Sequence, residues 1–584
     1  MFQLRFFFLV IAILVFLFPL QVVAKESVIP NRSGSQSITN TPINHEEENQ
    51  SQENNVEILH YSINIKIDHE KGVLFGKSTT KFKPLETNKD LLLVSLLTAG
   101  TVEDLEINGR KTTDFTFCTP PNSTASTAQQ AHLKMLVLTV PKEEFQHRSD
   151  PLEIAISYKD PNFSGTDTNP EDMTPFSTGQ ISRTNSFSSH MYPYPFVPFH
   201  SARAADIFIS TNLKDGVAIS SGKLLNVVER NGYKTFHYHT DDGSGELPYP
   251  FAIAAYNTLE TLASDGKTKL QLFFFPEDRV FAEQRFSLVQ KIFSNYVELF
   301  GKYPFPKLAI VETAPKEGTI GLAAQSVILL TQKKYFGMKL DENDLRITND
   351  PLFSLADEIN HQWNFYKIHS PTYLAEGISR YSDSLTAEHF GGAPALTNQM
   401  LQTTKSFLYL IGKMNIEDTP ITDPNVFPAL YFLKGAMALH MLRGMFGFEE
   451  FKTAMRLYFT ENEGKACDRN DLRMVFERVV KADLSWFFHQ WFEMKGWPKL
   501  KMQFWITKSE SNMYSLKIIV RQQQEPLFRL DNVPFQVEAK NGEKKTFYFN
   551  IKPQKTQDFE LNLEKEPKDV ILDPDGWVLK EMVD

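Results

Sequence analysis

Three hydrophobic patterns follow one another along the 584-residue chain. From Val56 onwards, apolar and polar residues alternate, as in residues 59–67, where Leu59, Tyr61 and the isoleucines that follow would share one face of a half-buried strand. Similar short segments occur at residues 133–140, 152–157 and 251–256. The alternation therefore predicts a β-rich N-terminal domain over residues 56–258.

Helical spacing replaces the alternation after a last predicted strand at residues 270–275. Residues 281–299 carry apolar side chains at steps of three and four and end near Gly301, and further helical segments continue to Trp491. Gly496, Trp497 and Pro498 interrupt this pattern, and alternation returns after Lys501. We expect a multidomain α+β protein with a helical domain over residues 259–498 and a C-terminal β-sandwich over residues 499–584.

The N-terminus has the pattern of a secretory signal. Arg5 precedes an apolar run at residues 6–18, and Ala24 is a small residue at the expected cleavage point. The run is shorter than the roughly 20 residues of a stable membrane span. Residues 1–24 therefore predict a signal peptide and an exported protein, secreted or periplasmic, whereas an uncleaved segment would tether it to a membrane. Residues 25–55 contain few aliphatic side chains and predict a disordered tether.

Composition excludes several classes of protein. A formal net charge of −10 argues against nucleic acid as a partner, because phosphate binding requires a cationic surface. Two cysteines, Cys118 and Cys467, are too few for a disulfide framework or a thiolate metal cluster.

One segment concentrates ionisable residues in a pattern with chemical meaning. Asp350 and Pro351 predict a helix start, and Asp357 and His361 then lie one turn apart, with Glu358 beside them. The segment differs by one residue from HExxH, in which two histidines bind zinc and the glutamate acts on the metal-bound water. Glu376 follows on a second predicted helix and supplies the type of side chain expected of a third ligand.

Ordinary structural roles remain open for each of these residues. Asp357 follows Ser354 by three positions, so the pair could form a capping box on a helix that begins later. His361 could be a buried histidine with hydrogen-bond partners, and Glu376 could be a surface carboxylate near a helix start.

The chain also resembles the membrane alanyl aminopeptidase family of gluzincin (HExxH zinc) metallopeptidases. This resemblance implies a β-rich N-terminal domain, a thermolysin-like helical catalytic domain and a C-terminal β-sandwich. It also implies a zinc cofactor, peptide or protein substrates, Glu358 as general base, and His361 and Glu376 as zinc ligands, with Asp357 at the position of the first ligand. The segments that carry the resemblance are the opening strand with Tyr61 and residues 192–195, 299–306, 357–363, 373–378, 432–435 and 484–491.

Four departures from the family pattern accompany the resemblance. Asp357 replaces a histidine ligand, and a second carboxylate on zinc would make the ion a weaker Lewis acid. The loop before Glu376 is shorter than in the family and contains His369 as a substitute ligand to consider. Ala324 stands where the family has the glutamate that binds the substrate amine. Phe432 stands where it has the tyrosine that stabilises the oxyanion, with Tyr431 one residue upstream.

Two functions follow from these observations. The first is an exported zinc metallopeptidase that hydrolyses peptides by metal-activated water at the divergent site. The second is a catalytically inactive peptidase-fold module that binds peptides or proteins. Hydrolysis of a non-peptide substrate at the same site is a weaker third hypothesis.

Overall fold

The computed structural model describes residues 56–85, 90–97, 101–118, 134–148, 150–160, 179–181, 185–188, 204–241, 249–313, 321–331, 351–508 and 513–583. The predicted signal peptide and tether lie outside these residues, as do residues 192–195. The chain forms two compact units. The first comprises Met1–Thr261, Thr268–Glu283 and Phe305–Gly337, and the second comprises Leu262–Lys267, Gln284–Pro304 and Met338–Asp584. The domain boundaries drawn from the sequence remain predictions.

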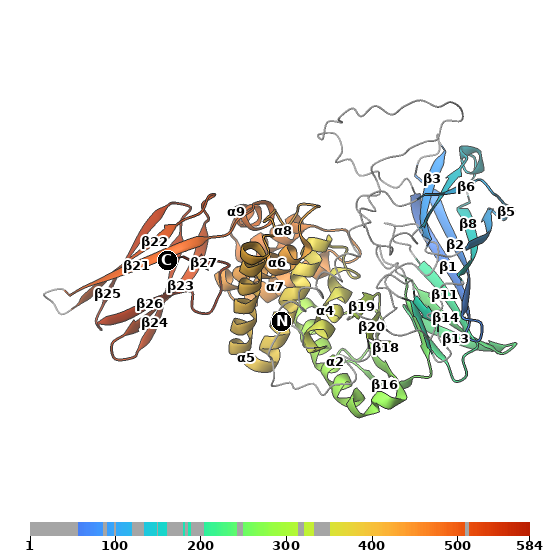
Figure 1. The fold of residues 1–584 in the computed structure, drawn as a ribbon, viewed down its shortest axis with the longest axis horizontal. Coiled ribbons are helices and arrows are strands. Elements are labelled where there is room, and N and C mark those ends of the chain that lie inside the picture. The colour runs from blue at the N-terminus through green and yellow to red at the C-terminus, as the bar shows by residue number, and fades with distance from the viewer. Residues whose placement is uncertain are drawn as a thin grey trace. The chain divides into compact units, whose positions relative to one another are not determined.

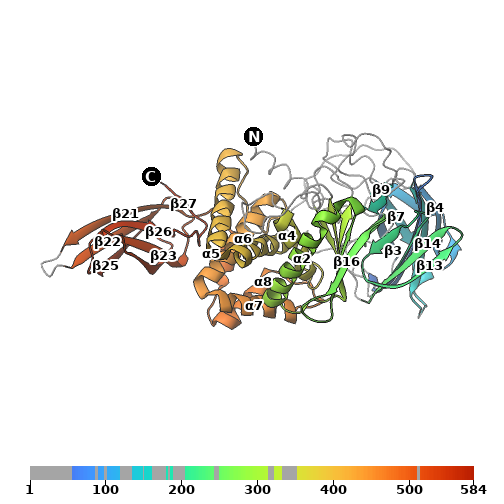
Figure 2. The ribbon, with the colours of Figure 1, turned by 90° about the horizontal axis from the view of Figure 1, so that it is seen from below.

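The largest sheet of the first unit has eight strands, and several of them are labelled in Figures 1 and 2. In spatial order they are β13 (Lys223–Arg230), β14 (Tyr233–Thr240), β11 (Ala204–Thr211), β1 (Val56–Asp68), β2 (Val73–Pro84), β8 (Leu152–Asp160), β4 (Thr101–Ile107) and β5 (Arg110–Lys111).

Strand β1 shows how far alternation determines the core. Tyr61, Ile63, Ile65 and Ile67 are all buried on the inner face, as the alternation predicts. Leu59 is an exception, because the register between β1 and β2 shifts between Ile58 and His60. This irregularity buries Ile58 and leaves Leu59 half-buried.

Three smaller sheets complete the described part of the first unit. The central strand of the five-stranded sheet, β18, is buried along its whole length and runs parallel to both neighbours, β17 and β20. The strands of the three sheets, in spatial order, are β12 (Val217–Ser220), β15 (Phe251–Ala254), β10 (Asn185–Ser188) and β9 (Gly179–Ile181); β3 (Leu91–Leu97), β7 (Lys134–Val140) and β6 (Phe115–Cys118); and β16 (Asn257–Leu262), β17 (Lys269–Phe274), β18 (Lys307–Thr313), β20 (Val327–Thr331) and β19 (Gly321–Ala324).

The second unit holds most of the helical region. Its long helix α5 bends at Gly392, whose φ of 70° is accessible to glycine at little cost. Within the described residues, no helix has both the length and the apolar content that a membrane crossing requires. The helices are α2 (Arg279–Phe300), which begins in the first unit, α4 (Pro351–Asn364), α5 (Thr372–Lys413), α6 (Pro428–Phe446), α7 (Phe448–Glu461), α8 (Arg469–Val480) and α9 (Ser485–Phe488), followed by a π-helical turn at His489–Glu493.

Two C-terminal sheets pack against this helical region within the second unit. The indole of Trp577 stacks on the ring of His440 in α6, with 4.3 Å between the ring centroids. The described structure therefore has a β-rich N-terminal region, a helical middle and C-terminal sheets, as predicted. The C-terminal strands are β25 (Thr556–Leu563), β22 (Tyr514–Gln522), β21 (Lys499–Lys508) and β27 (Glu581–Met582), and β24 (Lys544–Ile551), β23 (Leu530–Ala539) and β26 (Pro567–Leu572).

Candidate metal centre between helices α4 and α5

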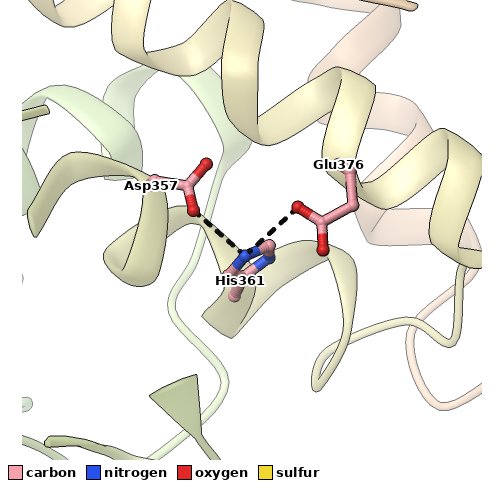
Figure 3. A group of neighbouring side chains, drawn as sticks. All are labelled: Asp357, His361 and Glu376. Carbon is pink, nitrogen blue, oxygen red and sulfur yellow. Dashed lines mark ion pairs between the residues drawn. The ribbon is translucent and has the colours of Figure 1, made fainter. Parts of the chain in front are cut away.

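Asp357, His361 and Glu376 converge on one point between two helices of the second unit. Asp357 and His361 project from α4, and Glu376 projects towards them from the first turns of α5 (Figure 3). His361 Nε2 lies 3.2 Å from Asp357 Oδ2 and 3.7 Å from Glu376 Oε2. The three potential ligand atoms all lie within 4.8 Å of one another.

These distances suit a bound divalent cation. Ligand atoms that lie 2.0–2.2 Å from a tetrahedral zinc ion are about 3.3–3.6 Å from one another. The two separations from His361 Nε2 bracket that range. The third pair, Asp357 and Glu376, also lies within 4.8 Å, so one ion could be shared after the carboxylates draw together. His361 and Glu376 are almost fully buried, whereas the Asp357 side chain is 23% exposed. The site is thus preformed and partly accessible to solvent from the side of Asp357.

Helix α4 holds its two site residues through a large aromatic contact. The helix begins at Pro351, so Ser354 lies inside it and does not cap a later start. Leu355, Ile359 and Trp363 are buried on the apolar face of α4. The Trp363 ring contacts a group of aromatic rings from α2 and the turn after it, Phe293, Tyr296, Phe300 and Tyr303. This packing fixes the rotation of α4 and hence the direction of Asp357 and His361.

A close helix contact positions Glu376. A Cβ atom built on Gly377 would lie 3.0 Å from the Cα of Gly435 in α6. The reciprocal distance, from a Cβ on Gly435 to the Cα of Gly377, is also 3.0 Å. Glycine is therefore favoured at both positions where α5 meets α6, directly after Glu376 and after Lys434, because a side chain on either would push the two backbones apart. This close packing explains the glycine in each of the two motifs, residues 373–378 and 432–435.

Asn364 connects the two helices behind His361. Its Nδ2 lies 2.9 Å from both Ala375 O and Ser379 Oγ, and 2.5 Å from Asn360 Oδ1. These acceptors orient the amide so that Asn364 Oδ1 faces His361 Nδ1 at 3.1 Å. Because an amide oxygen only accepts hydrogen bonds, His361 Nδ1 carries a proton and Nε2 faces the carboxylates. A second contact of 3.1 Å joins His361 Nδ1 to Ser379 Oγ.

Negative charge is in excess around His361. Burial disfavours the imidazolium, but the charges of Asp357 and Glu376 outweigh burial and raise the pKa of His361 to about 10. Burial raises the pKa of Glu376 above its usual range, although His361 opposes that shift. Burial also raises the pKa of Asp383, and the charge of Asp357 adds to this effect. A divalent cation would relieve the repulsion among these carboxylates.

The other sequence candidates have different positions. Glu358 is the next residue of α4 and is 9% exposed, and its charge contributes to the raised pKa values of His361 and Glu376. His369 is not part of the converging group, since its Nδ1 lies 3.3 Å from Phe365 O and its backbone pairs with residues near Cys467. Ala324 is buried in β19, in the first unit.

Tyr431 and Phe432 differ in their relation to the site. Tyr431 is buried in α6, and the charge of Glu376 adds to burial in raising the pKa of its phenol. Phe432 is only half-buried. The phenol one residue upstream of the family position therefore interacts electrostatically with the candidate metal ligand Glu376.

Sequence reasoning missed the polar network behind His361. Asn360, Asn364 and Ser379 are each fully buried. The sequence held one signal of this network, namely polar residues at helical spacing on helix faces that were expected to be buried. Such residues indicate a network because buried polar groups require hydrogen-bond partners. Their pairing across two helices was not visible in the local pattern.

Comparison with known proteins gives consistent matches. Residues 285–491 match the profile described as the peptidase family M1 domain. Aminopeptidase M1-D of Oryza sativa subsp. japonica is 23% identical over 295 residues, which is 48% of this chain and 33% of the rice protein. Glutamyl aminopeptidase of Sus scrofa is 22% identical over 267 residues, 43% of this chain and 28% of the pig protein. The matched regions thus span about a third of these relatives.

A solved structure matches over a longer stretch. The crystal structure of Legionella pneumophila aminopeptidase A in complex with aspartic acid superposes with a TM-score of 0.70 and 14% sequence identity. The match covers 91% of this chain and 60% of the Legionella chain. At this identity the likeness concerns the fold.

Proposed function

We propose that this chain, which belongs to the M1 aminopeptidase family of gluzincin metallopeptidases, is a zinc-dependent peptidase with a divergent Asp357, His361 and Glu376 site. The domain match and the related aminopeptidases confirm the family membership predicted from the sequence. A thermolysin-like arrangement of the helical domain and a C-terminal β-sandwich are part of the proposal. The observation that carries it is the convergence of three ligand atoms within 4.8 Å.

Each residue of the site has a defined task in this proposal. Zinc, when bound, would supply Lewis acidity towards water and the substrate carbonyl. Asp357, His361 and Glu376 would hold the ion, and Asn364 would keep the ring of His361 in the required tautomer. The carboxylate of Glu358 would accept the proton of the attacking water and later transfer it to the leaving amine. The phenol of Tyr431 would donate a hydrogen bond to the developing oxyanion.

The two carboxylate ligands predict slow peptide hydrolysis, and Ala324 predicts relaxed selection of substrates. Two carboxylate ligands neutralise the charge of zinc and weaken its polarising effect. Ala324 has no charge with which to bind a free α-amine, so the main electrostatic basis for selecting peptide N-termini is lost. We therefore propose peptide substrates without a strict requirement for a free N-terminus, and we propose export as the route to them.

The alternative function is a peptidase-fold binding module. It is favoured by the three positions where the family's chemistry is altered, Asp357, Ala324 and Phe432. In that case Glu358 has no catalytic task, and peptide binding is independent of its charge.

One set of measurements separates the two functions. Purified protein is reconstituted with zinc, its metal content is determined, and hydrolysis of a mixed peptide library is followed by mass spectrometry. Glu358→Gln should retain zinc and lose hydrolysis, whereas Glu564→Gln, an exposed control on the second unit, should retain both. Zinc binding without hydrolysis, together with peptide binding that survives Glu358→Gln, supports the binding module. Failure to bind zinc at this site would refute the peptidase proposal.

A further inference from the structure

His239 lies between two carboxylates on the face of the eight-stranded sheet opposite its core. Its Nδ1 is 2.9 Å from Asp206 Oδ1, and its Nε2 is 2.9 Å from Asp241 Oδ1. An ionised carboxylate only accepts hydrogen bonds, so both ring nitrogens must carry a proton if both contacts are to be hydrogen bonds. The geometry is therefore that of an imidazolium ion that bridges two acids.

Asp206 accepts hydrogen bonds from two further histidines. His237 Nε2 donates to Asp206 Oδ1 at 2.7 Å, and His60 Nε2 donates to Oδ2 at 2.9 Å. Three adjacent strands supply these groups, since His60 lies on β1, Asp206 on β11 and both other rings on β14. Asp206 is thus the point at which side chains join β1, β11 and β14.

The strand register fixes the positions of these side chains. Asp206 pairs with His239 across β11 and β14, so the two side chains lie on one face of the sheet. Tyr238, the residue before His239, is buried in the core, and its phenol donates a hydrogen bond of 2.8 Å to Ala218 O. Core packing on the opposite face therefore holds the backbone of β14 in place beneath His239.

Two lysines also face this group from the neighbouring strands. Lys223 of β13 pairs with His239, and Lys81 of β2 pairs with His60. Lys81 lies 3.4 Å from Glu153, which offsets its charge. Lys223 is exposed, so solvent screens its repulsion of an imidazolium on His239. The two carboxylates in direct contact with His239 therefore outweigh the facing lysines.

These contacts make the sheet sensitive to protons. We propose that His239 is a pH-sensitive switch: its protonated ring ties β14 to β11 in mildly acidic solution, and loss of one proton at higher pH breaks one of its two contacts. A neutral ring carries a single N–H and can donate to only one of Asp206 and Asp241. The lone pair of the other nitrogen then faces a carboxylate oxygen, which repels it.

The surrounding groups set the pH range of this switch. Hydrogen bonds to Asp241 and Asp206 raise the pKa of His239 above its usual value of 6.5, and burial opposes them only in part. The stability that His239 contributes is therefore complete below pH 6.5 and is lost as the pH rises through the raised pKa. Burial opposes ionisation of Asp206, but hydrogen bonds from the three histidines outweigh burial and lower its pKa to about 2. The contribution of Asp206 is present above pH 3.8 and is lost as the pH falls towards 2, so both contributions are complete between about pH 4 and pH 6.5.

Strand β14 also contacts the five-stranded sheet. Thr240, the residue after His239, has its Oγ1 3.3 Å from Gln325 Oε1, in the turn between β19 and β20. That turn directly follows Ala324, the position at which the family has its amine-binding glutamate. Deprotonation of His239 therefore acts on a strand that also supports this turn.

A titration of the full chain tests whether His239 behaves as a switch. The Cε1 resonances of the histidines are followed by NMR in isotope-labelled protein, and the His239 signal is identified by its absence from His239→Gln. We expect a titration midpoint above 6.5. Asp241→Asn should lower this midpoint, because it removes one of the two charges at a side chain that is 97% exposed and not needed for folding. Asp150→Asn changes another exposed aspartate of the first unit and, as the matched control, should leave the midpoint unchanged.

Hydrogen exchange measures the effect on the strand. Amide exchange of β14 is compared at about pH 6 and about pH 8, after correction for the exchange rate of an unfolded chain at each pH. The wild type should be more protected at the lower pH, and this difference should be smaller in His239→Gln, whose side chain does not titrate.

Two results would overturn the proposal. One is a titration midpoint of His239 at or below 6.5, and the other is an equal pH dependence of β14 exchange in the wild type and in His239→Gln. Either would leave Asp206 with hydrogen bonds that do not respond to pH in this range. Neither measurement involves the site between α4 and α5, so the outcome is independent of the peptidase proposal.

Discussion

Substitution of Asn364 by leucine tests whether the second helix holds the candidate metal ligand in place. Leucine has the same number and branching of side-chain heavy atoms as asparagine, but it has no polar atoms. Asn364 is fully buried, and its Oδ1 accepts one hydrogen bond while its Nδ2 has two protons for three neighbouring acceptors. The substitution therefore removes three hydrogen bonds between or within the helices that carry the site.

The expected magnitude follows from that count. Each buried hydrogen bond contributes on the order of 1 kcal/mol, so the loss is about 3 kcal/mol of unfolding free energy. For a cooperative unit of 150–250 residues, this corresponds to a fall of roughly 6–12 °C in unfolding temperature. Metal affinity should also fall by about 10–100-fold, because His361 loses the acceptor that fixes its tautomer.

Thermal unfolding followed by tryptophan emission measures the first effect, and zinc titration measures the second. Asn398→Leu is the matched control, since Asn398 is exposed on the neighbouring helix α5 and its substitution should change stability by no more than about 0.5 kcal/mol. If Asn364→Leu unfolds at the same temperature as Asn398→Leu and binds zinc equally well, the network does not support the site.

Three further substitutions test the negative charge of Asp357, the proposed hydrogen-bond donor to the oxyanion, and the buried carboxyl group of Glu312. Asp357→His removes one negative charge from the candidate zinc ligands, and it should increase the amount of zinc retained during dialysis against a chelator. Equal or lower zinc retention would contradict the predicted role of the Asp357 carboxylate. Tyr431→Phe should lower kcat by about 10²–10³-fold without loss of zinc, whereas Phe432→Leu should have little effect on kcat, and the reverse order would assign the oxyanion contact elsewhere. Burial raises the pKa of Glu312 to about 10, so its folded form keeps a proton that the unfolded chain releases above its ordinary value of 4.5. Stability from this group is present below pH 4.5 and is lost as the pH rises towards 10, so Glu312→Gln should gain on the order of 4 kcal/mol relative to wild type between pH 5 and pH 8. If the difference in unfolding free energy between Glu312→Gln and wild type is the same at pH 5 and at pH 8, Glu312 is not buried in its protonated form.

Local patterns predicted several elements but not all of them. The expectation that residues 270–275 form the last strand before the helical region was wrong, because β18, β20 and β19 follow it and extend the same sheet. The helix start at Pro351 and the one-turn spacing of Asp357 and His361 both follow from short segments, because a helix relates neighbouring residues by fixed geometry. The face of Leu59 could not be predicted, since the register shift in β1 depends on the partner strand β2.

Long-range polar contacts were the main omission. His60 and Asp206 are separated by 146 positions, and only the parallel pairing of β1 with β11 brings them together. Asn364 and Ser379 are closer in sequence, but their contact depends on the angle at which α4 meets α5. Buried polar residues in a predicted core helix therefore indicate that a partner exists without identifying it.

The departures from the family pattern change the charge of the candidate metal site more than they change its geometry. The shorter loop still brings Glu376 to within 3.7 Å of His361, and Asp357 occupies the first position at 3.2 Å. A site that had lost all selection for an ion would have no reason to bury Glu376 and His361 beside further carboxylates, because the repulsion costs stability in the metal-free state. Retention of that arrangement favours continued cation binding, whereas the added negative charge of Asp357 favours reduced Lewis acidity. Metal binding and catalytic rate should therefore be separable in this protein. Glu358→Gln should abolish hydrolysis while zinc stays bound, whereas Asp357→His should increase both zinc retention and rate.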